Sequence, residues 1–180
     1  MTDADDAAAV ARARGHVARA VADLAAASAR SEVLADFVPD RRVLGVPRAA
    51  RMTPTGRVWR LGVLLLDAEG NVFATGRVIR AERPARRSIT ANAVAEQRAY
   101  RAAAVKGGIA EGETVNFDAS PLPLELETFR TRVGPRVLAS VDSVPEVVVR
   151  WDPNRADAVI PLGAYLADRV DLLAHPPQGA

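Results

Sequence analysis

The stretch RVWRLGVLLLDAEGNVFATGRVI, residues 57–79, decides the expected fold. Its two apolar arms, 57–66 and 72–79, are separated by the polar segment DAEGN, and this pattern predicts a β-hairpin. Asp67 opens the polar segment, and Gly70 stands where a type I turn with a bulge requires a positive φ. We therefore expect the two arms to pair as antiparallel strands.

The first arm of this hairpin is apolar on both faces from Leu61 onward. A strand with one face in solvent would instead alternate apolar and polar residues, so this strand should lie inside a sheet that helices cover. The nearest helix candidate is 91–106, which is rich in alanine. Thr90 or Asn92 can cap its start, and the glycine pair at 107–108 ends it.

The remaining segments predict an α/β protein. Residues 4–36 have the pattern of a long alanine-rich helix, with a break expected near 28–31, and residues 161–173 predict a second amphipathic helix. Residues 39–56 predict an irregular connection with a short strand at 42–46, and their arginines would suit a binding loop, although no motif marks one. Alternation and turn residues predict four more elements. These are strands at 112–118, 136–141 and 146–151, and a short helix at 124–132.

This order of elements predicts a single α/β domain, built as a three-layer sandwich with a mixed sheet and helices on both faces. We divide the chain into an N-terminal helical segment, 1–38, and an α/β domain, 39–180. The 180 residues of the chain suit one domain of this kind.

The N-terminal helix carries a narrow apolar stripe flanked by alanines. The stripe consists of Val10, Val17, Val21 and Leu24. Such a helix gains little from burial on its own domain, whereas alanines let two helices approach closely, and a net charge of +2 offers little repulsion. We therefore expect a homodimer or homotetramer in which residues 4–28 contribute to an interface.

Composition excludes several classes of protein. The chain has no cysteine, which excludes disulfides, zinc–thiolate sites and cysteine nucleophiles. The acidic start MTDADD is followed by no apolar leader, and no apolar run is long enough to span a membrane. We therefore expect a soluble cytoplasmic protein.

A group of arginines follows the hairpin and provides candidate ligand contacts. The group consists of Arg77, Arg80, Arg83, Arg86 and Arg87. It could bind a phosphate, but few aromatic residues are interleaved to stack on bases, so nucleic acid is not the expected partner. We take Arg77, Arg80 and Asn92 as the candidate binding residues for a small-molecule ligand of unknown identity.

The run GVLLLDAEGNVFATG at 62–76, followed by VAEQRAYRAAAVKG at 94–107, resembles the cytidine deaminase family. The closing strand VVVRWDP at 147–153 and helix PLGAYL at 161–166 extend this resemblance, which covers roughly residues 57–173. The resemblance implies a deaminase-like α/β fold. It also implies assembly into oligomers, because small cytidine deaminases are similar in this respect.

The zinc site of that family is missing from this chain. Deaminases hold zinc with one His or Cys and two further cysteines, and a glutamate moves protons between the zinc water and the base. Glu96 stands at the position of that glutamate, but Val94 stands at the first ligand position, and the candidate second motif, 121–125, has no cysteine. We expect no metal and no cofactor. Glu96 is the one candidate catalytic residue, and it can also be interpreted as an acidic residue that the dipole of its helix favours.

Other hydrolase motifs are absent as well. A magnesium-dependent Nudix-like helix needs several glutamates, and helix 91–106 has only Glu96. The single lysine, Lys106, is not preceded at the required spacing by a serine, and no Gly-x-Ser-x-Gly elbow occurs. The two histidines, His16 and His175, lie near opposite ends of the chain.

The sequence therefore favours a non-catalytic protein on a deaminase-like scaffold, which acts by binding a ligand or by forming oligomers. The alternative is a metal-independent hydrolase of a nucleoside or amide, with Glu96 as its acid/base. A pocket in which Glu96 meets several polar groups would favour the enzyme, whereas an apolar pocket would favour the binding role.

Overall fold

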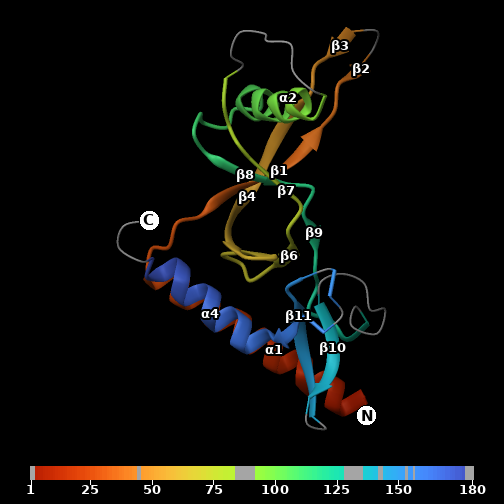
Figure 1. Ribbon diagram of the computed structural model, residues 1–180, viewed down its shortest axis with the longest axis vertical. Coiled ribbons are helices and arrows are strands. Elements are labelled where there is room, and N and C mark those ends of the chain that lie inside the picture. Colours follow the sequence, from red (N-terminus) through yellow and green to blue (C-terminus); the bar gives the residue numbers. More distant parts are fainter. Residues whose placement is uncertain are drawn as a thin grey trace. The chain divides into compact units, whose positions relative to one another are not determined.

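The computed structural model describes residues 3–43, 46–83, 92–127, 136–141, 144–152, 154–155 and 157–176. These residues form a mixed α/β protein with helices α1 (Asp3–Ala26), α2 (Asn92–Lys106) and α4 (Leu162–Ala174) (Figure 1). The strands of the first half are β1 (Glu32–Val38), β2 (Arg41–Val43), β3 (Val46–Arg48), β4 (Arg51–Leu61), β5 (Leu64–Asp67) and β6 (Val72–Ala74). The strands that follow are β7 (Arg77–Arg80), β8 (Thr114–Phe117), β9 (Ser120–Pro121), β10 (Arg136–Val141), β11 (Val144–Arg150) and β12 (Val159–Pro161).

The described strands form a seven-stranded sheet in the order β7-β8-β1-β4-β5-β6-β9, a three-stranded sheet β10-β11-β12 and the two-stranded ribbon β2-β3. The large sheet is mixed, because β1 runs parallel to β8 and antiparallel to β4. The expectation of an α/β protein with a mixed sheet is thus confirmed. Within the described part of the chain, no helix has the length and apolar character that crossing a membrane requires.

The chain divides into two compact units that interleave in sequence. Unit 1 consists of Met1–Arg30, Trp59–Ala74 and Ser120–Ala180, and unit 2 consists of Ser31–Val58 and Thr75–Ala119. Each unit has its own cluster of buried apolar side chains. The expected boundary at residue 38 falls within unit 2, at the end of β1.

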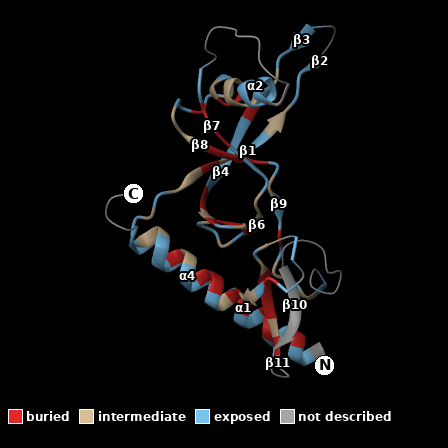
Figure 2. Cartoon of the chain, in the orientation of Figure 1, coloured by how far each residue is buried: buried red, intermediate tan, exposed pale blue. Residues whose placement is uncertain are grey.

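In unit 1, α1 packs against α4 and β11, and buried positions recur along the helices in Figure 2. The stripe residues Val10, Val17 and Leu24 are buried there together with alanines of α1. The expectation that this stripe would gain little from its own domain was therefore wrong. The reason is that α4 comes close, since a Cβ at Gly163 would lie 2.7 Å from the ring of His16.

The hairpin is confirmed, but its arms are shorter than expected. Strands β5 and β6 pair antiparallel with Leu65 opposite Phe73, and Gly70 has a φ of 84° in the turn between them. Asn71 donates its backbone N–H to Asp67 Oδ1 at 2.7 Å, which fixes the turn. The first arm breaks at Gly62, whose φ is 62°. The end of the second arm, β7, pairs with β8 instead of the first arm.

Burial of the first arm on both faces is also confirmed, because Leu61, Leu64 and Leu65 are all at most 1% exposed. The expected helix exists as α2, and Gly108, with a φ of 91°, follows its end. The buried residues of this helix and those of the first arm belong to different cores, however. Ala103 and Ala104 of α2 belong to the core of unit 2, whereas α1 and α4 supply the core around the arm.

In unit 2, the segment 32–38 is strand β1 and not the end of a helix, which corrects the prediction for 4–36. Its β-branched and aromatic residues gain backbone partners on both sides, from β4 and β8. Ser28, with a φ of 49°, lies between the end of α1 and this strand. The end of α2 lies tightly on β4, because a Cβ at Gly107 would clash with the carbonyl of Met52.

The other expectations have mixed outcomes. Strands β8, β10 and β11 and helix α4 lie where the sequence predicts them. The segment 39–56, expected as an irregular connection with one short strand at 42–46, instead contains the two strands of the ribbon β2–β3 and the start of β4. Strand β12 was not expected. The short helix proposed at 124–132 lies partly outside the described residues, which end at 127 in this segment.

Candidate functional site

Glu96 is part of a cluster of polar side chains in unit 2 that also contains Arg77, Tyr100 and Asp118. Glu96 and Tyr100 share a face of α2 because they lie four residues apart, and Arg77 reaches them from β7. Arg77 Nη1 donates to Glu96 Oε1 at 3.1 Å and to Tyr100 Oη at 2.6 Å. Tyr100 Oη donates to the same Glu96 oxygen at 2.8 Å, and Arg77 Nε lies 3.6 Å from Asp118 Oδ2.

The electrostatics of this cluster favour an ionised Glu96. The hydrogen bond from Tyr100, and then that from Arg77, lower the pKa of Glu96 below its ordinary value. The hydrogen bond to Glu96 raises the pKa of the Tyr100 hydroxyl. A general base works best with a pKa near the operating pH, so the lowered pKa makes Glu96 a weak base. Its side chain is also 56% exposed, and desolvation, which raises the pKa of Glu96, is a smaller effect than these two hydrogen bonds.

The positions that the deaminase resemblance assigns to zinc ligands do not form a metal site in the described residues. Val94 is 45% exposed on α2 in unit 2, and the segment 121–125 belongs to unit 1. No group of three His, Cys, Asp or Glu side chains could hold a metal within the described ranges.

The structure brings together only some of the candidate binding residues. Arg77 lies in the Glu96 cluster, whereas Arg80 is exposed at the end of β7. Asn92 begins α2, but its side chain lies outside the described residues, as do Arg86 and Arg87. Arg83 pairs with Glu111 at 3.3 Å. Of the described arginines after the hairpin, Arg77 and Arg83 therefore contact different carboxylates.

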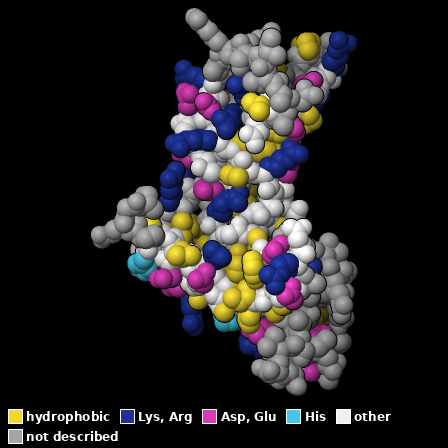
Figure 3. Space-filling model, viewed as in Figure 1, with side chains coloured by type: hydrophobic (Ala, Val, Ile, Leu, Met, Phe, Trp, Pro, Cys, Tyr) yellow, Lys and Arg dark blue, Asp and Glu magenta, His cyan; other side chains and the backbone are white. Residues whose placement is uncertain are grey.

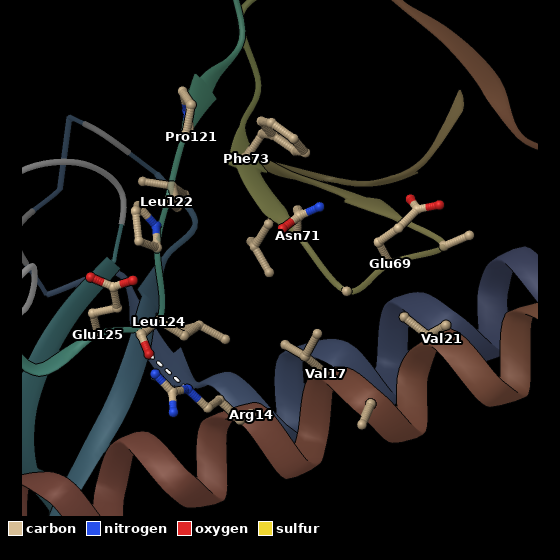
Figure 4. A pocket seen from close by; sticks show the side chains of 15 residues that line it. Arg14, Val17, Val21, Glu69, Asn71, Phe73, Pro121, Leu122, Leu124 and Glu125 are labelled. Atoms are coloured by element: carbon tan, nitrogen blue, oxygen red, sulfur yellow. Dashed lines mark hydrogen bonds between the residues drawn. The ribbon is translucent and has the colours of Figure 1, made fainter. Parts of the chain in front are cut away.

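Unit 1 contains an open groove of about 720 Å³, which runs between α1, the hairpin turn and the segment 121–125 (Figure 4). Figure 4 shows Val17 and Val21 projecting from α1 beneath the turn that carries Glu69 and Asn71. The lining comprises Arg14, Val17, Ala18, Val21, Ala68, Glu69, Gly70, Asn71, Val72, Phe73, Pro121, Leu122, Pro123, Leu124 and Glu125.

Hydrogen bonds between the segments that line this groove hold its walls together. The backbone N–H of Leu122 donates to the carbonyl of Val72 at 2.8 Å and joins the segment 121–125 to the start of β6. Arg14 Nε donates to the carbonyl of Leu124 at 2.9 Å, and this hydrogen bond joins α1 to the segment 121–125. The walls are mainly apolar, and the polar side chains stand at the rim. Only the hairpin turn could have pointed to this groove in the sequence, because its walls come from three distant segments.

Comparison of the chain with protein-family models, with curated proteins and with solved structures gave no match.

Proposed function

We propose that this chain is a non-catalytic ligand-binding protein whose ligand, a small molecule with an apolar body, occupies the groove of unit 1. The observation that carries this proposal is that the groove is lined by residues of unit 1, whereas the candidate catalytic residue belongs to unit 2. Glu96 is not among the residues that line the groove. Its carboxylate accepts hydrogen bonds from Arg77 and Tyr100 instead.

The groove has the features of a small-molecule site. Its volume of about 720 Å³ lies within the usual range for ligand pockets, which are mostly apolar and contain a few polar groups that orient the ligand. Val17 and Leu122 form buried walls, while Glu69 and Asn71 are exposed at the rim. Arg14 uses its Nε for the carbonyl of Leu124, which leaves its terminal Nη groups as donors for a ligand.

A deaminase-like scaffold without zinc remains part of this proposal. Its support is the order of hairpin, helix and strand in the chain, which follows the family pattern from β5 to β8. The separate cores of the hairpin and of α2 do not add support. A cytoplasmic location also remains proposed, because a chain without cysteine has no need of an oxidising compartment.

Binding in the groove can be tested with anilinonaphthalene sulfonate, a fluorescent molecule with an apolar body and one charge. We expect a saturable rise in fluorescence with the full chain. Ala18→Trp should weaken this binding by about tenfold or more, because Ala18 lines the groove and a bulky side chain there would fill it. Ala8→Trp is the matched control, since Ala8 is exposed on α1 and does not line the groove. Equal binding by both variants would refute the proposed site.

The absence of catalysis can be tested independently. Purified protein should contain much less than about one zinc per chain by elemental analysis, since Val94 and a chain without cysteine offer no ligand set. It should also show no deamination of cytidine and no hydrolysis of nucleosides. Stoichiometric zinc, or turnover that Glu96→Gln abolishes, would contradict the non-catalytic assignment.

A further inference from the structure

A second groove, of about 300 Å³, lies entirely within unit 2, between the ribbon β2–β3, the start of β4 and the end of α2. Four basic side chains line it, and none of the lining residues that the structure describes is a carboxylate. The four are Arg41, Arg48, Arg51 and Lys106. Figure 3 shows basic side chains in dark blue at the ribbon. This groove is distinct from the apolar groove of unit 1 and from the Glu96 cluster.

None of these four side chains has a hydrogen bond or ion pair with any residue that the structure describes. Other arginines of unit 2 do have such partners. Arg57 pairs with Glu113 at 3.4 Å, and Arg101 pairs with Glu82 at 2.7 Å. The chain as a whole carries a net charge of only +2, so four unpaired cations around one small groove are a local excess of positive charge.

The register of the ribbon places two of these cations directly opposite each other. Arg41 pairs with Arg48 across the antiparallel strands β2 and β3. Side chains at such positions have Cβ atoms about 4.5–5.5 Å apart, and like charges there destabilise the pairing. A bound anion would remove this repulsion, because it would place negative charge between the two guanidinium groups.

The groove is held in place by rigid backbone. The end of α2 is fixed on β4, because Gly107 lies so close to the carbonyl of Met52 that no Cβ would fit. This contact brings Lys106 to the groove beside the start of β4. Pro39 and Pro47 also line the groove and restrict the backbone around the arginines. The dipole of α2 alone would favour a cation at Lys106, but it does not account for the three arginines.

We propose that this groove binds a compact polyphosphate, such as pyrophosphate or the phosphate chain of a nucleoside polyphosphate. Guanidinium groups match phosphate oxygens with paired hydrogen bonds, and a lysine adds a mobile point charge. Among the described lining residues there is no aromatic side chain on which a base could stack, and this favours recognition of phosphate over recognition of single-stranded nucleic acid. The proposal adds a second ligand and does not depend on the function proposed for unit 1.

The test is a calorimetric titration of the full chain with pyrophosphate at physiological ionic strength. We expect saturable binding of about one pyrophosphate per chain, and a loss of about tenfold or more in affinity for the double variant Arg41→Gln/Arg48→Gln. Arg42→Gln is the matched control, because Arg42 lies on the same ribbon, pairs with Pro47 and does not line the groove. This control should bind pyrophosphate like the wild type.

Two further measurements distinguish the outcomes. Without pyrophosphate, the double variant should melt at the same or a higher temperature than the wild type, because the like-charge pair is gone; this result would show that lost binding is not lost folding. A single-stranded oligonucleotide should compete weakly. No saturable pyrophosphate binding, an equal loss with Arg42→Gln, or an oligonucleotide that binds much more tightly than pyrophosphate would each overturn the proposal.

Discussion

The hydroxyl of Tyr165 lies against Gly62, in the space that a Cβ at residue 62 would occupy. It donates to the carbonyl of Leu61 and accepts from the N–H of Val63, both at 2.9 Å. One side chain of α4 therefore satisfies the peptide groups on both sides of the break between β4 and β5. The expected hairpin arm ends at this point because Gly62 has a positive φ and Tyr165 replaces the missing strand partners.

The first prediction concerns this contact. Tyr165→Phe should lower the free energy of unfolding by about 1–3 kcal/mol, because the carbonyl of Leu61 loses its buried partner. Denaturation followed by tryptophan fluorescence can measure this, since Trp59 is buried in the same unit. Tyr100→Phe, which removes an exposed hydroxyl, should cost less than about 1 kcal/mol. Equal costs for the two variants would show that the hydroxyl of Tyr165 contributes no more than an exposed hydroxyl does.

The hairpin turn provides a second prediction. Gly70→Ala should destabilise the protein by about 1 kcal/mol, because its φ of 84° is strained for any residue with a Cβ. Gly15→Ala should instead stabilise by about 0.5–1 kcal/mol, since Gly15 is exposed within α1 and a Cβ there meets nothing within 4 Å. Denaturation midpoints of both variants test the pair, and a stabilising effect of Gly70→Ala would contradict this description of the turn.

The Glu96 cluster predicts a pKa that can be measured directly. Removal of the Tyr100 hydroxyl by Tyr100→Phe should raise the pKa of Glu96 toward its ordinary value, because this hydrogen bond is the largest cause of the lowered pKa. The pKa should stay below that value, because Arg77 still contacts the carboxylate. Titration of the side-chain carboxyl by NMR measures the shift. An unchanged pKa in Tyr100→Phe would show that the hydrogen bond is absent in solution.

The same shift fixes the sign of the pH dependence. A carboxyl group whose native pKa is lowered stabilises the folded state above its unfolded pKa, and this contribution is lost as the pH falls through the native pKa. The wild type should therefore lose slightly more stability than Glu96→Gln on acidification across that window. The effect should be small and weakened by salt, because the side chains of Arg77 and Glu96 are 54% and 56% exposed.

A homodimer or homotetramer stays a prediction, but the structure changes where we expect its interface. The apolar stripe of α1 is buried in the core of unit 1, so removal of the residues before Ser31 should unfold that unit. Trp151 and Val159 are exposed by 48% and 42%; Trp151 follows the end of β11, and Val159 begins β12 opposite Arg150. If light scattering shows an oligomer at tens of micromolar, Trp151→Ser should weaken it, whereas Val78→Ser should not. A monomeric full-length chain would refute the prediction.

The sequence by itself determined the elements whose signals are local. Gly70 at the turn, the glycines after Lys106 and the apolar spacing of residues 161–173 correctly predicted the turn, the end of α2 and helix α4. These signals are local because a turn type requires a particular φ and a helix buries one face at a fixed period.

Only the tertiary structure decided how these elements are partnered. The sequence of 32–38 is compatible with the continuation of a helix, but the segment is a strand because β4 and β8 pair with its two edges. Strand β7 does not pair with the first arm of the hairpin, because it pairs with β8. The candidate sites depend on the same long-range pairing. Arg77 meets Glu96 only because β7 and α2 place them together, and Lys106 joins the arginines of the second groove only because the end of α2 packs on β4. Hydrogen bonding and burial between distant segments leave no periodic pattern in the sequence. The sequence could therefore indicate candidate residues, but it could not predict which of them contact each other.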